Sequence, residues 1–396
     1  MKNFSFYSPT KVIFGKDVQN AVGEEVVFWG GTKVLIHYGG GSAVRSGLID
    51  TVKKSLEKAG VAYVELGGVK PNPRLSLIRE GIALCQKENV DFILAVGGGS
   101  AIDSAKGIAL GVANPDVDVW KFYTHEEAPK AALPVADILT IAAAGSETSP
   151  GSVVTNEDGM LKRSIDTDIL RPRFAMMNPE LTYTLPKYQI SCGIVDIMMH
   201  TIERYFGPER GNDLTDRIGE SVLTTCIKYG PMRLKDTEDY KAASEVMWAG
   251  SLSHNGLTGC GNNGDFATHK LGHELSAKYD VAHGASLSAV WGSWARYVMH
   301  HNVNRFAAYA VKVWGCDIDS DHPEWTAMKG IEMTENFFAS IDMPISIPEL
   351  GLGEVSDQDL REMAEKCSDF GTTPVGNFLS LDQNDMYKIY KMANSR

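Results

Sequence analysis

Hydrophobic and polar positions divide the first half of the chain into two alternating kinds of segment. Apolar runs without polar alternation occupy residues 33–42, 61–68 and 91–100, and each is followed by a stretch with helical spacing, at residues 43–60, 73–90 and 101–113. Strands that are apolar throughout and joined by helices are typical of a parallel sheet covered on both faces. The pattern predicts a doubly wound, Rossmann-like α/β domain.

The pattern changes after about residue 185. Apolar residues then recur at helical spacing and strand-like runs nearly vanish. Pro179 and Pro186 frame the change, and proline restricts both itself and the residue before it. For a chain of 396 residues, two domains are expected. We therefore predict an α/β domain at residues 1–185 and an all-helical domain at residues 186–396.

Composition narrows the class of protein. A hydrophobic fraction of 43% with 22% charged residues is typical of a folded globular chain, and no apolar run is long enough for a membrane span. A net charge of -12 argues against nucleic-acid and anionic-membrane partners. The N-terminal residues lack an export signal, and the six cysteines form no CxxC pair. We expect a cytoplasmic protein with reduced thiols.

Two glycine triplets, Gly39–Gly41 and Gly97–Gly99, end predicted strands. Such turns lie at the carboxyl ends of parallel strands, where helix N-termini attract phosphate groups. One triplet alone can be only a tight turn, but two in one parallel domain favour a dinucleotide. The expected contacts are Gly40, Gly41 and Ser42 in the first turn, and Gly98, Gly99, Ser100 and Asp103 in the second.

The residues after the first triplet bear on which dinucleotide is bound. Neither triplet matches GxGxxG followed by an acidic residue, which binds the adenosine ribose of NAD. The segment YGGGSAVRSG instead offers Ser42 and Arg45 to a 2′-phosphate. This favours NADP(H) over NAD(H). An acidic residue that reaches the ribose from elsewhere in the chain remains the alternative.

Histidines and one carboxylate gather in the second half. His269 and His273 lie four residues apart, as do Asp196 and His200, so each pair shares a helix face, and His283 follows nearby. Asp196 and His200 would be costly in an apolar helix without a partner. Three imidazoles and one carboxylate suit Zn²⁺ or Fe²⁺. The alternative is hydrogen-bonded core histidines; the protease motifs HExxH and HxxEH are both absent.

Several motifs in order carry a family resemblance. VGGGSAIDSAK, GSETSPGSVVTNEDGMLKR, NPELTYTLP, GIVDIMMHTIERY and ATHKLGHEL with the later AHG together resemble the iron-containing, or group III, alcohol dehydrogenases, over nearly the whole chain. The resemblance is strongest to the branch of butanol dehydrogenases and NADP-dependent aldehyde reductases. Phe266 stands where close relatives often have tryptophan, and Ala143 and Ala144 replace a usual glycine and threonine.

The resemblance implies a role for individual positions. It implies one divalent Fe²⁺ or Zn²⁺ bound by Asp196, His200, His269 and His283, and it places His273 near the nicotinamide as a proton-relay or substrate-orienting residue. It adds Asn72, Thr140 and Lys162 to the cofactor groove. It further implies a dehydroquinate synthase-like architecture of a dinucleotide-binding domain followed by a metal-binding domain, and a dimer.

The implied reaction converts primary alcohols and aldehydes by hydride transfer with NAD(P)(H), and a small alcohol or aldehyde is the expected substrate. Two other classes stay open at this point. A sugar-phosphate cyclase resembling dehydroquinate synthase would also use NAD and a metal, but the metal-bearing segments offer little basic charge beyond Lys270 and Lys278. A nucleotide-binding or metal-sensing protein without activity is the other.

Overall fold

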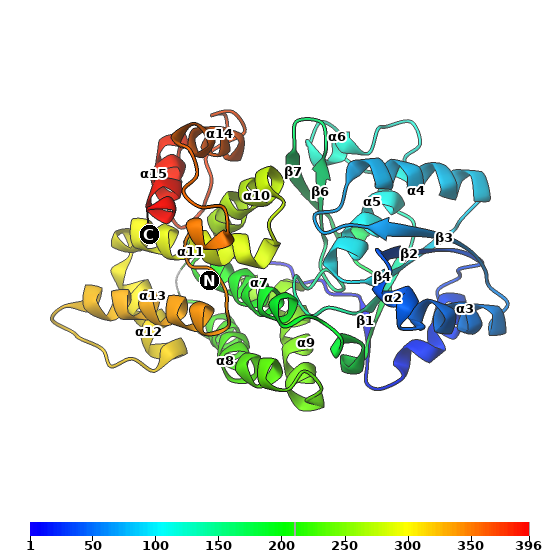
Figure 1. Cartoon of the computed structure of the whole chain (residues 1–396), viewed down its shortest axis with the longest axis horizontal. Coiled ribbons are helices and arrows are strands. Elements are labelled where there is room, and N and C mark those ends of the chain that lie inside the picture. The colour runs from blue at the N-terminus through cyan, green and yellow to red at the C-terminus, as the bar shows by residue number, and fades with distance from the viewer. Residues whose placement is uncertain (210, 396) are drawn as a thin grey trace. The chain divides into compact units, whose positions relative to one another are not determined.

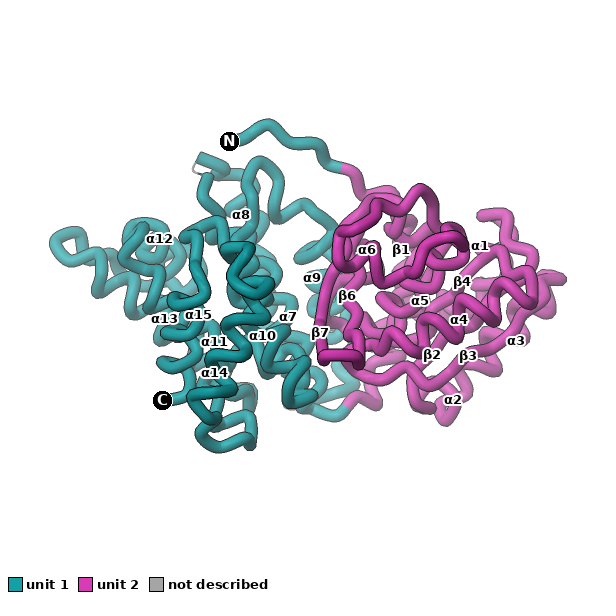
Figure 2. The backbone as a smooth tube through the Cα atoms, turned by 90° about the horizontal axis from the view of Figure 1, so that it is seen from above, with its two compact units in different colours: residues 1–6, 186–396 teal, residues 7–185 magenta. Residues whose placement is uncertain are grey.

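The computed structural model describes residues 1–209 and 211–395, which form two compact units (Figures 1 and 2). One unit comprises residues 7–185, and the other comprises residues 186–396 together with Met1–Phe6. We predicted that the first six residues belong to the α/β domain, and this is wrong. The backbone N–H of Lys2 donates to the Gly261 carbonyl at 3.0 Å, which ties the start of the chain to the helical unit.

A six-stranded, wholly parallel sheet forms the centre of the α/β unit, in the order β1-β8-β5-β4-β2-β3. Its strands are β1 (Lys11–Phe14), β2 (Lys33–Gly39), β3 (Ala62–Val69), β4 (Phe92–Gly97), β5 (Val135–Leu139) and β8 (Phe174–Met177). The inner strands β2, β4, β5 and β8 are buried because helices cover both faces, as the unbroken apolar runs of β2 and β4 predicted. The α/β fold class is thereby confirmed.

Helices pack on both faces of this sheet. The helices of the unit are α1 (Val22–Phe28), α2 (Ser42–Arg45), α3 (Leu48–Lys58), α4 (Leu75–Glu88), α5 (Gly99–Ala113) and α6 (Trp120–Tyr123). One face forms a core with α1 and α3, in which Val26, Val52 and Phe92 are fully buried. On the other face α4 packs on α5, and α5 packs on β4. Figure 1 shows α4 and α3 on opposite sides of the strands.

Two local features differ from the predicted pattern. The helix expected at residues 43–60 is interrupted at Gly47, whose φ of 76° is left-handed, so α2 and α3 are separate. An antiparallel hairpin of β6 (Gly151–Asn156) and β7 (Leu161–Asp166) was not predicted. The N–H of Thr155 in β6 donates to the Pro73 carbonyl at 2.8 Å, which holds this hairpin beside the segment after β3.

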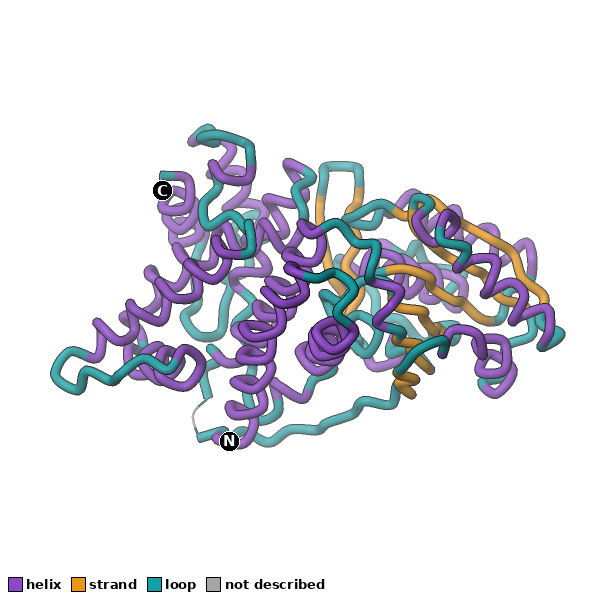
Figure 3. The backbone as a smooth tube through the Cα atoms, turned by 60° about the horizontal axis from the view of Figure 1, so that its bottom comes forward, coloured by secondary structure: helices purple, strands orange, loops and turns teal. Residues whose placement is uncertain are grey.

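The other unit is helical, as predicted (Figure 3). Its helices are α7 (Lys187–Tyr205), α8 (Asp213–Lys235), α9 (Tyr240–His254), α10 (Ala267–Tyr279), α11 (His283–Val298), α12 (Val303–Trp314), α13 (Pro323–Ser340), α14 (Asp357–Cys367) and α15 (Gln383–Asn394). Helix α7 packs against α8, α9, α10 and α11, so it is buried along most of its length. The side chains of Asp196, His200 and Glu203 on α7 are therefore enclosed by protein.

Among residues 1–209 and 211–395, no helix is both long and apolar enough to cross a membrane.

Candidate active site

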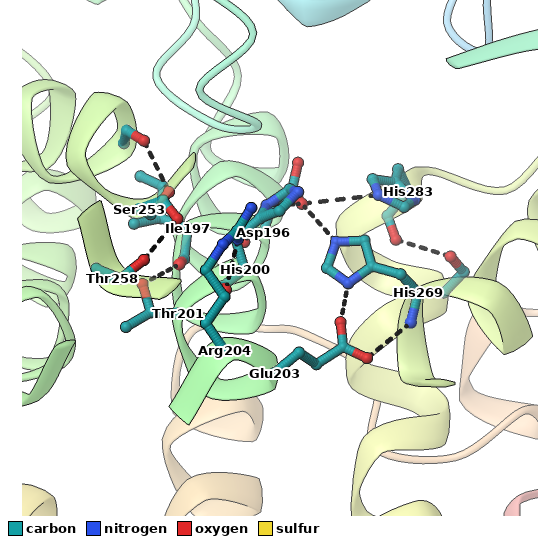
Figure 4. Close-up of polar contacts among 12 residues, drawn as sticks. Asp196, Ile197, His200, Thr201, Glu203, Arg204, Ser253, Thr258, His269 and His283 are labelled. Carbon is teal, nitrogen blue, oxygen red and sulfur yellow. Dashed lines mark hydrogen bonds and ion pairs between the residues drawn. The ribbon is translucent and has the colours of Figure 1, made fainter. Parts of the chain in front are cut away.

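Four predicted metal ligands converge within the helical unit. Asp196 and His200 lie one turn apart on α7, His269 lies in the first turn of α10, and His283 is the first residue of α11. One ligand atom each from Asp196, His200 and His269 lies within 4.8 Å of the others. The Nε2 atoms of His269 and His283 each lie 3.7 Å from Asp196 Oδ1. Figure 4 shows these side chains pointing toward one another.

The contacts of His269 Nε2 test whether a metal fits. This atom is buried, and among the described residues it has no hydrogen-bond partner. Its 3.7 Å separation from Asp196 Oδ1 is too long for a hydrogen bond. Two ligands that each lie about 2.1 Å from one tetrahedral ion would be roughly 3.4 Å apart. The spacing and the mixed imidazole and carboxylate donors therefore fit a divalent metal ion.

The charges around the four residues also favour a cation. Burial raises the pKa of Asp196, but the imidazoles of His200 and His283 outweigh it and hold the pKa well below its usual range. Burial lowers the pKa of His269, but the carboxylates of Glu203 and Asp196 outweigh it and raise the pKa to about 9. Carboxylates on two sides of one imidazole thus favour a positive charge there, which a metal ion can supply in place of a proton.

A glycine allows α11 to approach α7 closely. A Cβ atom on Gly284 would lie 2.2 Å from the carbonyl oxygen of Cys192 on α7, and backbone atoms cannot move aside as a side-chain tip can. Because Gly284 follows His283 directly, this contact brings the His283 ring to Asp196. The sequence singled out the histidine, but the reason for the following glycine becomes visible only in the packed structure.

Two further residues lie beside the predicted metal ligands, and neither of them was assigned to the site from the sequence. Glu203 on α7 is fully buried and contacts the Nδ1 atom of His269. It follows Asp196 by seven residues and His200 by three, a spacing that puts all three on one helix face. His254 on α9 is half-buried, and its ring centroid lies 4.0 Å from that of His200.

His273 lies one helical turn after His269 and is buried. Its ring centroid is 5.3 Å from that of His283 and 6.3 Å from that of His269. Among the described residues, Asp196, His200 and His269 form the group whose ligand atoms lie within 4.8 Å of one another, and His273 is not part of it. The structure thus places His273 beside the predicted metal ligands and not among them.

The predicted glycine turns lie at the carboxyl ends of adjacent strands of the α/β unit. Gly98 and Gly99 join β4 to α5, and the first turn of α5 has no side-chain cap. A Cβ on Gly98 would lie 3.0 Å from Ile141, and one on Gly99 would lie 3.2 Å from Ser146. Thr140 continues β5 beside this turn, since its N–H donates to Gly97 at 2.9 Å. Ser100 is half-buried on α5.

The other triplet follows β2, the neighbour of β4 in the sheet. Gly41 has a φ of 122°, which only glycine adopts readily, and Ser42 begins the four-residue helix α2. A Cβ on Gly41 would lie 3.0 Å from the Arg45 guanidinium. Gly40 has open space around its Cα. This turn therefore presents backbone groups next to a positive charge.

Asn72 and Lys162 contact each other. Lys162 on β7 donates from Nζ to Asn72 Oδ1 at 2.9 Å, and both residues are buried. Asp103 on α5 faces the same hairpin, since its Oδ2 accepts the Val153 N–H at 3.1 Å. Burial raises the pKa of Asp103 to about 6, against the opposing charge of Lys106. The structure thus gives Asp103 a contact with the hairpin that the sequence did not predict.

Lys106 was missed in the sequence. It is fully buried on α5, and its Nζ donates to the carbonyls of Ser146, Ser149 and Gly151 at 2.8, 2.9 and 2.8 Å. The first two carbonyls belong to the connection between β5 and β6, which also lies beside the Gly98–Gly99 turn, and Gly151 begins β6. Lys106 therefore fixes the loop that packs against the predicted pyrophosphate turn.

Both parts of the chain match models of one protein family. The model described as iron-containing alcohol dehydrogenase matches residues 9–179. The model described as the C-terminal part of the Fe-containing alcohol dehydrogenase family matches residues 190–394. Together the two matches cover both units.

Individual relatives match over almost their whole length. The chain is 38% identical to NADH-dependent butanol dehydrogenase A of Clostridium acetobutylicum, over 99% of this chain and 100% of that protein. It is 33% identical to the NADPH-dependent aldehyde reductase YqhD of Escherichia coli, with the same coverage. Its structure is similar to that of NADH-dependent butanol dehydrogenase A from Thermotoga maritima, with a TM-score of 0.94 at 34% identity over 99% of each chain.

Proposed function

The chain belongs to the iron-containing alcohol dehydrogenase family, and from that premise we propose that it interconverts primary alcohols and aldehydes by hydride transfer with NAD(P)(H). The observation that carries the proposal is the convergence of Asp196, His200 and His269, with ligand atoms within 4.8 Å of one another. Relatives named as butanol dehydrogenases and an aldehyde reductase support a small alcohol or aldehyde as the substrate.

Asp196, His200, His269 and His283 would hold one divalent ion, Fe²⁺ or Zn²⁺. The chemistry that such an ion supplies when bound is Lewis-acid polarisation of the substrate oxygen. The chain's own contribution is to fix one carboxylate and three imidazoles on three helices. Asp196, His200 and His269 are all buried, so bulk water is kept from them.

His273 is proposed as the residue that moves the proton of the substrate hydroxyl. Its ring lies 5.3 Å from that of His283, centroid to centroid, so it borders the ligand cluster. An imidazole has an ordinary pKa close to neutrality and can accept and return a proton at one ring nitrogen. The proton would be accepted in alcohol oxidation and donated in aldehyde reduction.

The glycine turns would bind the dinucleotide, which supplies or accepts the hydride. Gly98, Gly99 and Ser100 would bind the pyrophosphate at the start of α5, with Asp103, Asn72, Thr140 and Lys162 around the same groove. Gly40, Gly41 and Ser42 would bind the adenosine side. Arg45 beside Gly41 supports a preference for NADP(H), because a guanidinium can bind a 2′-phosphate.

The sugar-phosphate cyclase is not supported. Neither matching family model describes a cyclase, and the named relatives given above are dehydrogenases or reductases.

A cytoplasmic homodimer is part of the same proposal. Strand β1 lies at an edge of the sheet, so its outer backbone groups can pair with another chain. Exposed apolar side chains lie on β1 and on the neighbouring helix α1, where Phe14 is 38% and Phe28 is 71% exposed. Closed two-fold pairing would cover these side chains in both copies.

The proposal is tested by elemental analysis of the purified protein together with oxidation of NADPH and NADH over a panel of aldehydes. We expect about one Fe²⁺ or Zn²⁺ per chain and turnover of short aldehydes. His269→Ala should lose both the metal and the activity but keep dinucleotide binding. His300→Ala removes an exposed histidine of the same unit and should change neither. Full activity in metal-free His269→Ala protein would refute the proposal.

A further inference from the structure

Glu203 is a second carboxylate on α7, close to the predicted metal ligands. Its side chain is 0% exposed, although nothing in the proposed reaction uses it. Burial of a carboxylate is costly unless its oxygens are paired. The partners of Glu203 therefore indicate what it does.

Both carboxylate oxygens of Glu203 contact the same residue. Oε1 accepts the backbone N–H of His269 at 3.1 Å, and Oε2 contacts the ring Nδ1 of His269. The backbone carbonyl of Glu203 also accepts the N–H of Asp265 at 2.7 Å. Figure 4 shows the carboxylate lying below the His269 ring, on the side away from Asp196. One residue of α7 thus holds both the start of α10 and the ring that α10 carries.

The backbone contact adds to the capping of α10, whose first N–H, that of Ala267, is accepted by Asp265 Oδ2 at 3.1 Å. Helix α10 begins at Ala267, and the preceding Phe266 has a left-handed φ of 61° and makes no side-chain cap. His269 is the third residue of the helix, so its N–H has no partner within the helix. Glu203 accepts this N–H from a neighbouring helix, and its negative charge suits a helix N-terminus.

The ring contact decides which nitrogen of His269 can bind a metal. A ring N–H at Nδ1 that donates to the carboxylate leaves the lone pair on Nε2. Nε2 is the atom that lies 3.7 Å from Asp196 Oδ1 and has no hydrogen-bond partner among the described residues. Carboxylates that accept from the second nitrogen of a ligand histidine orient the ring and make it a stronger donor.

We infer that Glu203 is a positioning residue of the metal centre, which fixes the tautomer and direction of the His269 ring and caps the helix that carries it. The inference rests on the metal centre proposed above. Glu203 is not itself a ligand, because both of its oxygens are occupied by His269.

Glu203→Gln separates the two contacts. Glutamine has the same shape and keeps an oxygen for the His269 backbone N–H, but its NH₂ group would face Nδ1. The ring must then accept at Nδ1 and carry its proton on Nε2, which removes the lone pair that binds the metal. We expect roughly a 10- to 100-fold higher Kd for Zn²⁺, with unchanged helix content and NADPH binding.

The Kd is measured by competition with a chromophoric zinc chelator on the full chain. Glu335→Gln is the matched control, since Glu335 is also buried in the helical unit, where it pairs with Arg296 at 2.7 Å. The control should keep the Kd of the unmodified protein. Equal Zn²⁺ Kd values for Glu203→Gln and the unmodified protein would overturn the role of Glu203.

A second measurement does not depend on the folding of the variant. Long-range ¹H–¹⁵N spectra of the Zn²⁺-loaded unmodified protein should show His269 protonated at Nδ1 and metal-bound at Nε2. A metal-bound Nδ1 would overturn the inference. The two proposals fail differently: if the unmodified protein binds no Zn²⁺, the metal centre is wrong, whereas tight binding by both proteins contradicts only the role of Glu203.

Discussion

The close contact between α7 and α11 leads to a sharp prediction for Gly284→Ala. The added Cβ would lie 2.2 Å from the Cys192 carbonyl oxygen, whereas non-bonded heavy atoms settle at about 3.5 Å. The two backbones must therefore separate by roughly 1 Å or more. Because His283 precedes Gly284 directly, its ring moves away from Asp196, with which it now forms a 3.7 Å contact.

The displacement is large compared with what a metal site tolerates. Ligand distances are held within about 0.2 Å, so a shift of roughly 1 Å removes His283 from the coordination of the ion. We expect Gly284→Ala to weaken Zn²⁺ binding by roughly 100-fold or more. Overpacking should also destabilise the helical unit by about 1–3 kcal/mol.

The assay is the chelator competition used for Glu203, combined with thermal unfolding of the metal-free protein. Gly219→Ala is the matched control, because a Cβ at Gly219 on α8 would meet only Thr201 Cγ2 at an ordinary 3.4 Å. That variant should keep its metal affinity and its stability, since alanine also favours the helix. Normal metal binding by Gly284→Ala would refute the argument that this glycine sets the position of His283.

Three further predictions concern the α/β unit. Arg45→Ala should lower kcat/KM for NADPH by roughly 10-fold or more and leave that for NADH nearly unchanged, because a charged hydrogen bond to the 2′-phosphate is lost; a fall for both cofactors would contradict the NADP(H) preference. Lys106→Met should remove the charged donor shared by three carbonyls and raise the Kd for NADPH in a fluorescence titration, while an unchanged Kd would show that the loop does not depend on Lys106. Burial lowers the pKa of His37 from 6.5 to about 4, so the unfolded chain binds the proton first and stability falls as the pH drops from about 6.5 to about 4. The free energy of unfolding should fall by roughly 3 kcal/mol over this pH range because of His37. Denaturant unfolding of His37→Asn at both pH values should show a correspondingly smaller decrease.

The fold could be predicted because its strongest signals are local. The apolar runs of β2 and β4 are continuous because both faces of these strands are covered, and that pattern is visible in sequence alone. The β6–β7 hairpin was missed although Asp158 and Gly159 lie at its turn, because its strands are short and mixed in polarity. The break at Gly47 depends on one backbone angle, which the helical periodicity around it concealed.

The candidate site was predictable where ligand pairs share a helix face. Asp196 with His200, and His269 with His273, stand four residues apart, so spacing alone places each pair together. The approach of α7 to α10 depends on tertiary packing, and the link from Glu203 to His269 joins residues 66 apart in the chain. The reach of Lys106 to three carbonyls likewise has no local sequence signal.

The helical unit contains both the first six residues and everything after residue 185, and this has a consequence during protein synthesis. Residues 1–6 are made before the α/β unit, whereas Gly261, the backbone partner of Lys2, is made about 255 residues after Phe6. At roughly 5–20 residues per second that delay is on the order of 10–50 s. The α/β unit can fold during this interval, before the helices that contact residues 1–6 have been made. Completion of the helical unit thus depends on a segment that the whole α/β unit separates from it along the chain.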